Sequence, residues 1–235
     1  MIFRILFLSI LFGVYGFSQK PDPDTILENV KNQFDEIEDY QVDIKVKVDI
    51  DFLKMSDRKA TLFYKKPDKI HIESDNFAML PKSGLNFSPF GFLDFKYSAF
   101  YGREDTIDGV QTAVIKVIPL DGTADVILTT LWIDTERNLI LKVESARRPQ
   151  GTFTVGLEYS EIDGKYWLPS SIVFVFTIDP GLFPGRFLGS KGDDKDEENK
   201  DLDESTTGTV YLSYSNYKVN IGLPDDLFEE MDKNK

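Results

Sequence analysis

The residues that most often carry enzyme chemistry are scarce in this chain, which has one histidine, His71, and no cysteine. The lack of cysteine excludes a disulfide framework, a thiolate zinc site and a cysteine nucleophile. A Ser-His-Asp triad would have to use His71 as its base, and a metal site built from several histidines is excluded. In the segment Lys69-Ile-His-Ile-Glu73 the two isoleucines take the apolar face of a strand. We therefore predict that His71 is a surface residue, because a general base would need a pocket on the polar face.

The remaining chemistry would rest on carboxylates, and no pair of them stands out. Asp49 and Asp51 share one face of a predicted strand with Lys45 and Lys47, which is typical of a solvated face. The sequence has no phosphate-binding glycine loop, no HExxH motif and no GxSxG motif. A carboxylate-dependent hydrolase would need two acids about 5–10 Å apart in a cleft. We therefore predict that the protein is not an enzyme and that it holds no cofactor and no metal.

The charge balance is strongly acidic, with 27 Lys+Arg against 40 Asp+Glu and a formal net charge of −13 over 235 residues. Phosphates would repel such a chain, so a nucleic-acid partner is excluded from the prediction. Acids are densest in residues 192–206, where the sixth-position glycine of an EF-hand calcium loop is missing. We predict one domain over residues 19–235, with an acidic, disordered insert over residues 191–206.

The first 18 residues have the pattern of a secretory signal peptide. Arg4 supplies a basic start, an apolar run follows from Ile5 to Val14, and Gly16 and Ser18 place small residues before a cut at Gln19. The run is too short to span a bilayer, and no other segment has the length of apolar sequence that spanning needs. We expect export to the periplasm and no transmembrane segment in the mature form.

Hydrophobic periodicity predicts one helix followed by a long antiparallel meander. Thr25 and Glu28 have the spacing of a capping box, and Ile26, Leu27 and Val30 begin an apolar stripe. Strict alternation then predicts a strand over residues 40–52. Nine further strands are predicted at about 58–65, 69–76, 94–101, 111–118, 125–134, 139–147, 152–161, 166–178 and 206–219.

Ten consecutive strands curl into a barrel or a strongly bent sheet. We predict a β-rich α+β fold with a single antiparallel, strongly curved sheet, a half-barrel of about ten or eleven strands. The N-terminal helix and short helices, one of them starting at Pro224, are expected to cover it. Asp163-Gly164 between two alternating runs predicts a two-residue hairpin.

Two segments rich in phenylalanine, proline and glycine, residues 85–95 and 180–188, are predicted to be loops. Large apolar side chains on a loop must be buried, form a lid or face a partner. These three alternatives remain open: plugs for an open barrel end, a mobile lid over a ligand cavity, or a contact with another protein.

Several short motifs resemble those of the outer-membrane lipoprotein carrier (LolA/LolB-like) superfamily, over roughly residues 24–230. They are the helix and long strand from Ile26 to Phe52, Ala60 to Ile70, Leu131 to Glu136 with Ile140 to Val143, and Gly222 to Phe228. The resemblance implies an eleven-stranded half-barrel, closed by helices, around a cavity for lipid acyl chains. It also implies a lid latch at Lys66, where the carrier has an arginine, with loss of the planar guanidinium fork.

We therefore expect a periplasmic carrier that shields the acyl chains of a lipoprotein or another lipid, with inner- or outer-membrane transport proteins as partners. The alternative is a non-enzymatic envelope interaction module with a packed barrel interior. The predicted cavity lining is Val46, Val48, Ile50, Phe63, Ile70, Leu131, Ile133 and Phe174. The predicted lid or latch is Lys66, Phe87, Phe90, Phe92, Phe183 and Phe187.

Overall fold

The computed structural model describes residues 21–50, 56–74, 96–120, 126–147, 151–178 and 206–228. These residues form one helix and ten strands. The helix is α1 (Pro23–Asn32). The strands are β1 (Asp39–Asp49), β2 (Arg58–Lys65), β3 (Lys69–Glu73), β4 (Tyr97–Ile107), β5 (Val110–Pro119), β6 (Val126–Asp134), β7 (Leu139–Arg147), β8 (Gly151–Ile162), β9 (Tyr166–Ile178) and β10 (Thr206–Val219).

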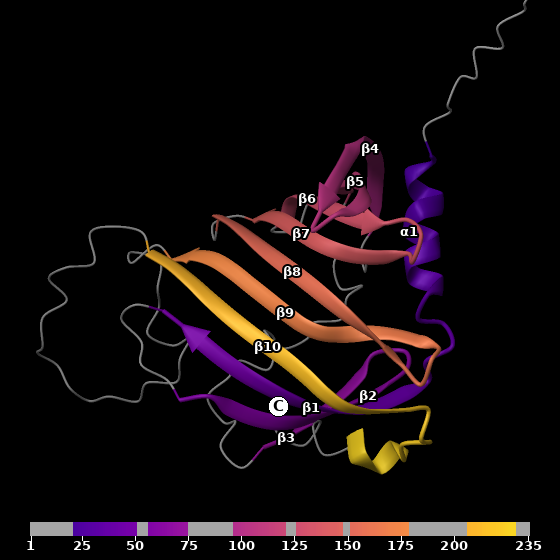
Figure 1. Ribbon diagram of the computed structural model, residues 1–235, viewed down its shortest axis with the longest axis vertical. Helices are drawn as coiled ribbons and strands as arrows, with labels where there is room; N and C mark the ends of the chain where they lie inside the picture. Colours follow the sequence, from indigo (N-terminus) through magenta and orange to yellow (C-terminus); the bar gives the residue numbers. More distant parts are fainter. Residues whose placement is uncertain are drawn as a thin grey trace, which may run out of the picture.

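All ten strands belong to one antiparallel sheet with the order β3-β2-β1-β10-β9-β8-β7-β6-β5-β4. Strand β10 returns to pair with β1, so the two ends of the described chain meet in the middle of the sheet. The sheet is strongly curved but not closed, with β3 and β4 as its edges (Figure 1). The predicted β-rich α+β fold with a single curved sheet is confirmed.

The N-cap of helix α1 lies three residues before the predicted one. The side chain of Asp22, not that of Thr25, caps the helix, and it accepts hydrogen bonds from Thr25 N at 3.2 Å and Thr25 Oγ1 at 2.8 Å. Pro23 occupies the first turn, where its fixed φ favours the helix and its missing N–H costs nothing. The predicted apolar stripe is confirmed, because Ile26, Leu27 and Val30 are all buried.

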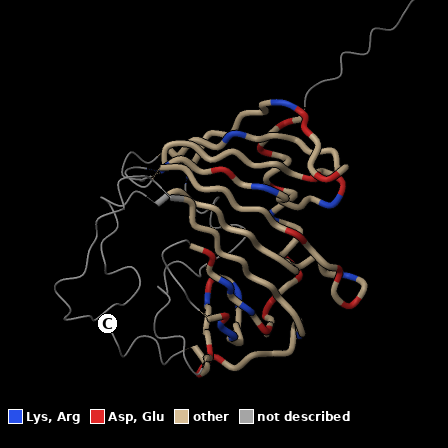
Figure 2. Tube along the Cα trace, turned by 60° about the vertical axis from the view of Figure 1, so that its left-hand side comes forward, with Lys and Arg blue, Asp and Glu red and all other residues tan. Residues whose placement is uncertain are grey.

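The stripe of α1 defines the inner face of the sheet. Its three apolar residues join one core cluster with side chains from eight strands, among them Ile115, Leu131 and Ile133. The side chains that alternate with these, such as Lys116 and Trp132, lie on the outer face. Lysines, arginines and acids are interspersed along the strands, as Figure 2 shows.

Because the strands alternate in direction, the sheet has two different ends. The end that we call the turn end carries the tight turns after β2, β4, β6 and β8, and the segment after β10. The opposite end, which we call the loop end, carries the connections after β1, β3, β5, β7 and β9. The predicted hairpin at Asp163-Gly164 is confirmed at the turn end, with φ angles of 54° and 64°.

The ends of the predicted elements differ from the observed ones in a few places. Strand β4 reaches Ile107, well beyond the predicted residue 101, because a bulge between Tyr101 and Arg103 lets pairing with β5 continue. At the C-terminus, the expected helix is a short 3₁₀ turn over residues 225–228. The predicted signal peptide and acidic insert lie outside the described residues.

Candidate functional site

The centre of the inner face is filled with side chains. Leu27 of α1 lies in one core cluster with Ile115, Leu131 and Ile133, and all four are completely buried. These branched side chains come from α1, β5 and β6, where alternation directs them inward. The middle of the half-barrel is therefore a packed core, and a ligand there would have to displace side chains.

At the turn end, the inner face carries a cluster of tyrosines. The ring centroid of Tyr40 lies 5.0 Å from that of Tyr64 and 5.7 Å from that of Tyr217. The hydroxyl of Tyr217 donates a hydrogen bond to the carbonyl oxygen of Pro169 at 2.7 Å, and that of Tyr159 donates to the carbonyl oxygen of Ile140 at 2.9 Å. Burial raises the pKa of Tyr40, Tyr159 and Tyr217 above the ordinary value. The hydroxyls are tied to the fold, so this end is closed.

At the loop end, the inner face presents half-buried aromatic rings. Phe174 lies between Phe153 and Phe176, with ring centroids 5.0 Å and 5.3 Å away. The guanidinium of Arg147 lies 5.3 Å from the ring centroid of Phe153. Val48 of β1 and Val210 of β10 are also only partly buried against the core at this end. This surface is apolar and partly open, and it is our candidate site.

The predicted lining residues occupy different environments. Val46, Leu131 and Ile133 lie inside the packed core cluster. Val48, Ile70 and Phe174 are partly buried on the margin of that cluster. Ile50 is buried just beyond β1. Of these seven, Val48 and Phe174 stand in the open part of the loop end, and their role in lining a cavity stays a prediction.

Phe63, the eighth predicted lining residue, lies on the other face of the sheet. It pairs with His71 across β2 and β3, and their ring centroids are 5.8 Å apart. The residues next to it, Leu62 and Tyr64, take the inner face. The prediction placed Phe63 with the inner residues on the strength of the resemblance to the carriers, whereas the alternation of β2 groups Phe63 with Thr61 and Lys65 on the other face.

His71 is more covered than the sequence indicated. Its side chain is only 17% exposed, and its Nε2 lies 3.6 Å from Glu73 Oε1. Its Nδ1 is buried and has no hydrogen-bond partner. Phe63, its pairing partner on β2, lies against the imidazole ring of His71. The expectation of a surface histidine is therefore wrong, because an aromatic neighbour makes the outer face of β2 and β3 partly apolar.

The predicted latch residue, Lys66, lies at the turn end. Its ammonium donates a hydrogen bond to the backbone oxygen of Asp35 at 2.7 Å and lies 3.8 Å from Glu38 Oε1. It therefore ties the segment after α1 to the turn between β2 and β3. The other lid candidates, Phe87, Phe90, Phe92, Phe183 and Phe187, lie outside the described residues.

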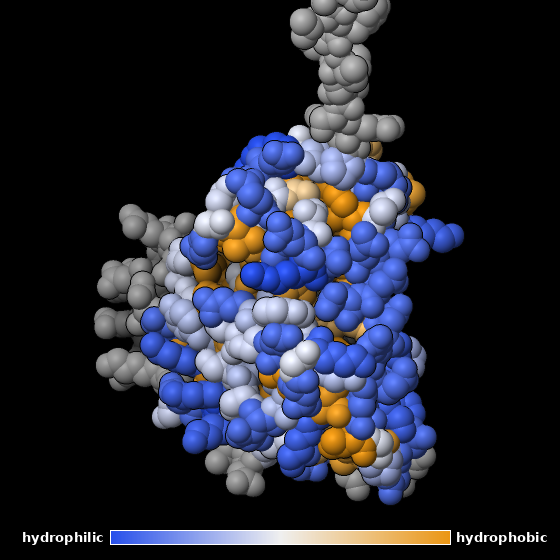
Figure 3. Space-filling view, turned by 45° about the vertical axis from the view of Figure 1, so that its right-hand side comes forward, coloured by the Kyte–Doolittle hydropathy of each residue, from blue (hydrophilic) through white to orange (hydrophobic). Residues whose placement is uncertain are grey.

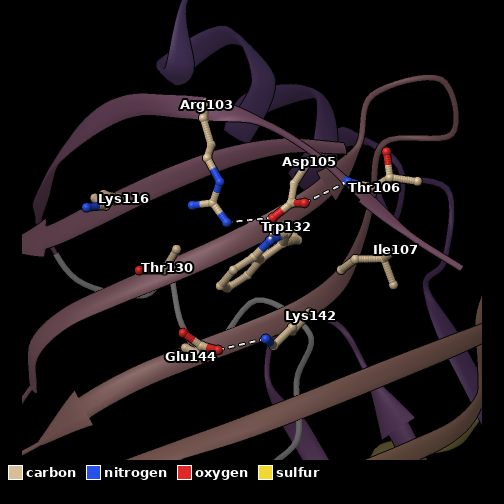
Figure 4. Close-up of a pocket in the computed structure, with 9 residues that line it drawn as sticks. All are labelled: Arg103, Asp105, Thr106, Ile107, Lys116, Thr130, Trp132, Lys142 and Glu144. Carbon is tan, nitrogen blue, oxygen red and sulfur yellow. Dashed lines mark hydrogen bonds and ion pairs between the residues drawn. The ribbon is translucent and has the colours of Figure 1, made fainter. Parts of the chain in front are cut away.

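The outer face has a shallow depression of about 520 Å³ over β4–β7, lined by charged and polar side chains around Trp132 (Figure 4). The indole N–H of Trp132 donates to Asp105 Oδ2 at 3.0 Å, and Arg103 lies 2.6 Å from the same oxygen. Lys142 lies 4.4 Å from the centroid of the Trp132 ring and 2.7 Å from Glu144 Oε1. These charges satisfy one another.

The two carboxylates of the depression do not form an acid–base pair. The hydrogen bond from Trp132, with that from the backbone N–H of Thr106, lowers the pKa of Asp105 below its ordinary value. A general acid needs a raised pKa, so the depression gives no support to the hydrolase alternative. Among the described residues no group of three or more His, Cys, Asp and Glu could hold a metal ion.

Three solved structures share this architecture over nearly the whole chain. An outer membrane lipoprotein-sorting protein domain from Vibrio parahaemolyticus has a TM-score of 0.61 at 14% identity, covering 88% of this chain and 96% of that one. A LolA superfamily protein from Nitrosomonas europaea has a TM-score of 0.54 at 13% identity, with 88% and 96% covered. The chain has a LolA-like fold.

A DUF1329 family protein from Desulfovibrio piger also has this LolA-like fold, with a TM-score of 0.59 at 13% identity and coverage of 90% of this chain and 99% of that one. No family model and no curated protein matches the sequence. At such low identity the likeness shows the fold alone.

Sequence reasoning did not single out Phe153 or Phe176 as site residues. The signal was present in the alternation of Phe153, Val155 and Leu157, which places all three on one face of β8. What the pattern could not show is that β8 and β9 pair with Phe153 opposite Phe176, which gathers the rings at one end.

Proposed function

We propose that this protein is a periplasmic carrier that binds the acyl chains of a lipoprotein or another lipid. The observation that carries the proposal is the half-buried aromatic surface of Phe153, Phe174 and Phe176 on the inner face at the loop end. Each methylene left in water costs about 0.8 kcal/mol, so a chain of many methylenes needs such a surface to cross an aqueous compartment.

The packed centre of the half-barrel favours a site at one end over a cavity along the whole sheet. Leu131 and Ile133 are completely buried by other side chains. An acyl chain on the rings of the loop end would bury apolar surface without displacing them. Arg147, beside Phe153, would lie near the mouth of such a site and could pair with an anionic group on the lipid.

The proposed location rests on the sequence of the first 18 residues, which has the pattern of an export signal. Within the described ranges, none of the helical segments has the length and hydropathy needed to span a bilayer. Membrane transport proteins that deliver or receive the lipid are the expected partners.

The test is native mass spectrometry of the exported protein, followed by organic extraction and lipid analysis. We expect a stoichiometric acylated species that is lost in Phe174→Glu, which puts a charge among the rings. The matched control is Tyr211→Glu, because Tyr211 is 37% exposed and lies one strand away on β10. A bare protein mass, with no uptake of a fluorescent fatty acid, would contradict the proposal.

The alternative is an envelope interaction module without a ligand, and the completely buried centre of the inner face favours it. That alternative predicts no fatty-acid uptake by the wild type and equal behaviour of Phe174→Glu and Tyr211→Glu. The same experiment therefore separates the two functions.

A further inference from the structure

Exposed apolar side chains gather at one part of the loop end. Six large hydrophobic residues are exposed in the part of the chain that the structure describes, and four of them lie on β4–β6 or directly beside them. They are Phe100 at 53%, Ile118 at 41%, Leu120 at 63% and Ile127 at 45% exposed. In a protein with a large buried core, such a concentration marks a contact surface.

The strand register brings these side chains together. Phe100 of β4 pairs with Lys116 of β5, and Ile118 pairs with Ser98 two residues along. The backbone N–H of Leu120 donates to the carbonyl oxygen of Lys96 at 2.8 Å, which holds the start of β4 beside the end of β5. Phe100, Ile118 and Leu120 therefore lie on the outer face at the loop end of β4 and β5, and Ile127 lies at the start of the adjoining strand β6. We call these four residues the apolar rim.

Cations accompany the apolar rim. Lys96 and Lys116 are exposed, and no ion pair joins either to an acid among the described residues. Arg147 lies at the same end but on the inner face, where its guanidinium contacts Phe153, and it pairs with Val126 at the start of β6. Glu144, an acid on the neighbouring strand β7, pairs with Lys142 at 2.7 Å.

The other half of the loop end differs in composition. Around β1–β3 it carries Asp49, Asp57 and Glu73, with Lys45 bound to Asp57 at 2.7 Å. Figure 2 brings the loop end forward and shows charged residues of both signs around β1–β3. The loop end of β4–β6 therefore carries two exposed lysines beside exposed phenylalanine and leucine, although the whole chain has a net charge of −13.

We infer that the apolar rim is a docking surface for a bilayer that contains anionic phospholipids. Apolar side chains at the rim would enter the boundary between headgroups and acyl chains, and Lys96 and Lys116 would face lipid phosphates. The net negative charge of the whole chain does not prevent this, because charges farther away than a Debye length of about 8 Å are screened.

The position of the rim beside the candidate site is the argument for a bilayer as the partner. Ser145, two residues before Arg147, pairs with Phe153 of β8, and the ring of Phe153 contacts Phe174. A bilayer at this end of the sheet could meet both the rim on the outer face and the aromatic surface on the inner face, and an acyl chain would pass over the ends of β6 and β7 between them. This inference goes beyond the proposed function, since an acyl chain could bind without any docking surface.

The experiment measures sedimentation of the mature full-length protein with phosphatidylcholine vesicles, with and without phosphatidylglycerol. We expect binding that requires phosphatidylglycerol and weakens as salt is raised. Lys116→Glu should lower the affinity about tenfold, because it changes the rim by two charge units. Leu120→Ser should lower it several-fold by removing an apolar contact.

Matched controls lie away from the rim. Lys59→Glu reverses an exposed lysine on β2, and Ile221→Ser removes a 48% exposed apolar residue at the turn end. Both should bind vesicles as the wild type does, and the Tm of every variant shows that it is folded. Absence of vesicle binding by the wild type, or equal effects of rim and control variants, would overturn the docking surface.

Fatty-acid uptake by the same proteins separates this inference from the proposed function. Lys116→Glu should take up a fluorescent fatty acid normally while losing vesicle binding. Phe174→Glu should bind vesicles normally while losing uptake of the fatty acid. If the wild type binds vesicles but takes up no fatty acid, the carrier proposal fails and the docking surface stands.

Discussion

The two ends of the half-barrel use the same strands for different purposes. At the turn end, tight turns and fixed polar contacts close the structure, and residues such as Asp108, Asn138 and Asp163 adopt positive φ angles that the turns require. At the loop end, the inner face ends in half-buried phenylalanine rings, and the outer edge exposes further apolar side chains. Figure 3 brings the turn end forward and shows a surface that is mainly hydrophilic, with hydrophobic residues in separate patches.

This difference indicates that the turn end stabilises the fold and that the loop end is the surface for recognition. The buried carboxylate of Asp39 at the turn end accepts hydrogen bonds from the backbone N–H groups of Ile221, Gly222 and Leu223 at 2.8–3.2 Å. This arrangement fastens the C-terminal segment to β1. At the loop end, the described rings of Phe153, Phe174 and Phe176 pack against one another, and the guanidinium of Arg147 lies over Phe153.

The largest difference between the turn end and the loop end is expected within a single strand, β9. Leu168 is 2% exposed near the turn end, and Phe174 is half-buried near the loop end. Leu168→Ala should lower the free energy of unfolding by about 3 kcal/mol, because it leaves a cavity in a packed region. Phe174→Ala should cost about 1 kcal/mol and reduce fatty-acid uptake strongly. Urea unfolding and a fluorescence uptake assay measure the two effects.

The division between a stabilising turn end and a recognition surface at the loop end would be contradicted if Leu168→Ala reduced uptake as much as Phe174→Ala while the protein remained folded. It would also fail if Phe174→Ala were the more destabilising of the two. Either outcome would show that the rings belong to the structural core.

Removal of the buried carboxylate of Asp39 should destabilise the protein somewhat less than the cavity left by Leu168→Ala. Asp39→Ala leaves three backbone N–H groups without their acceptor, which costs about 2 kcal/mol. Thermal unfolding should show a lower Tm, and fatty-acid uptake at temperatures below it should be unchanged. Asp43→Ala, at a more exposed position on the same strand, is the control. Equal Tm values for the two variants would contradict the anchoring role of Asp39.

Alkaline pH should weaken the turn end before the loop end. Burial raises the pKa of Tyr40, Tyr159 and Tyr217 above the ordinary value of 10.0, so folding favours the neutral phenols. Their contribution to stability is therefore complete below pH 10 and is lost as the pH rises above that value. Absorbance titration at rising pH should show tyrosines that ionise only on unfolding. Ionisation of every tyrosine near its ordinary pKa in the folded protein would contradict the closed cluster.

The smallest effect is expected at the exposed ion pairs of the C-terminal turn. Lys69, followed by Lys65, lowers the pKa of Asp225 to about 2. These contacts should persist at neutral pH and weaken as the pH falls from 4 toward that value. Asp225→Ala should leave the free energy of unfolding almost unchanged, since the pairs are solvated. A loss comparable to that of Asp39→Ala in urea unfolding would contradict this.

The sequence predicted the sheet well because its signals are local. The alternation over residues 40–52 and the Asp163-Gly164 turn depend on neighbouring residues only, and both predicted the correct elements. The pairing of strands that are not neighbours in the sequence depends on residues far apart in the chain. The pairing of β1 with β10 joins segments more than 150 residues apart, and the sequence did not predict it. The predicted meander continues from the third strand to the fourth, whereas β3 and β4 are the two edges of the observed sheet.

The site was harder to predict, since it depends on which parts of the inner face are filled. Leu131, Ile133 and Phe174 are all apolar residues at alternating positions, and nothing in their neighbourhoods shows that only Phe174 remains partly open. Phe63 lies on the outer face because it alternates with the inward-facing Leu62 and Tyr64 of β2. Packing density is a property of the whole fold, so it becomes visible only when the strands are placed.

The most direct test of the account is to locate a bound acyl chain by photo-crosslinking. A fatty acid with a terminal diazirine would be bound to the wild-type protein, irradiated and mapped by mass spectrometry of proteolytic fragments. We predict adducts on the loop-end halves of β8 and β9, at and around Phe153 and Phe174, and their loss in Phe174→Glu. Adducts confined to the outer depression around Trp132, or spread over the turn end, would contradict the account.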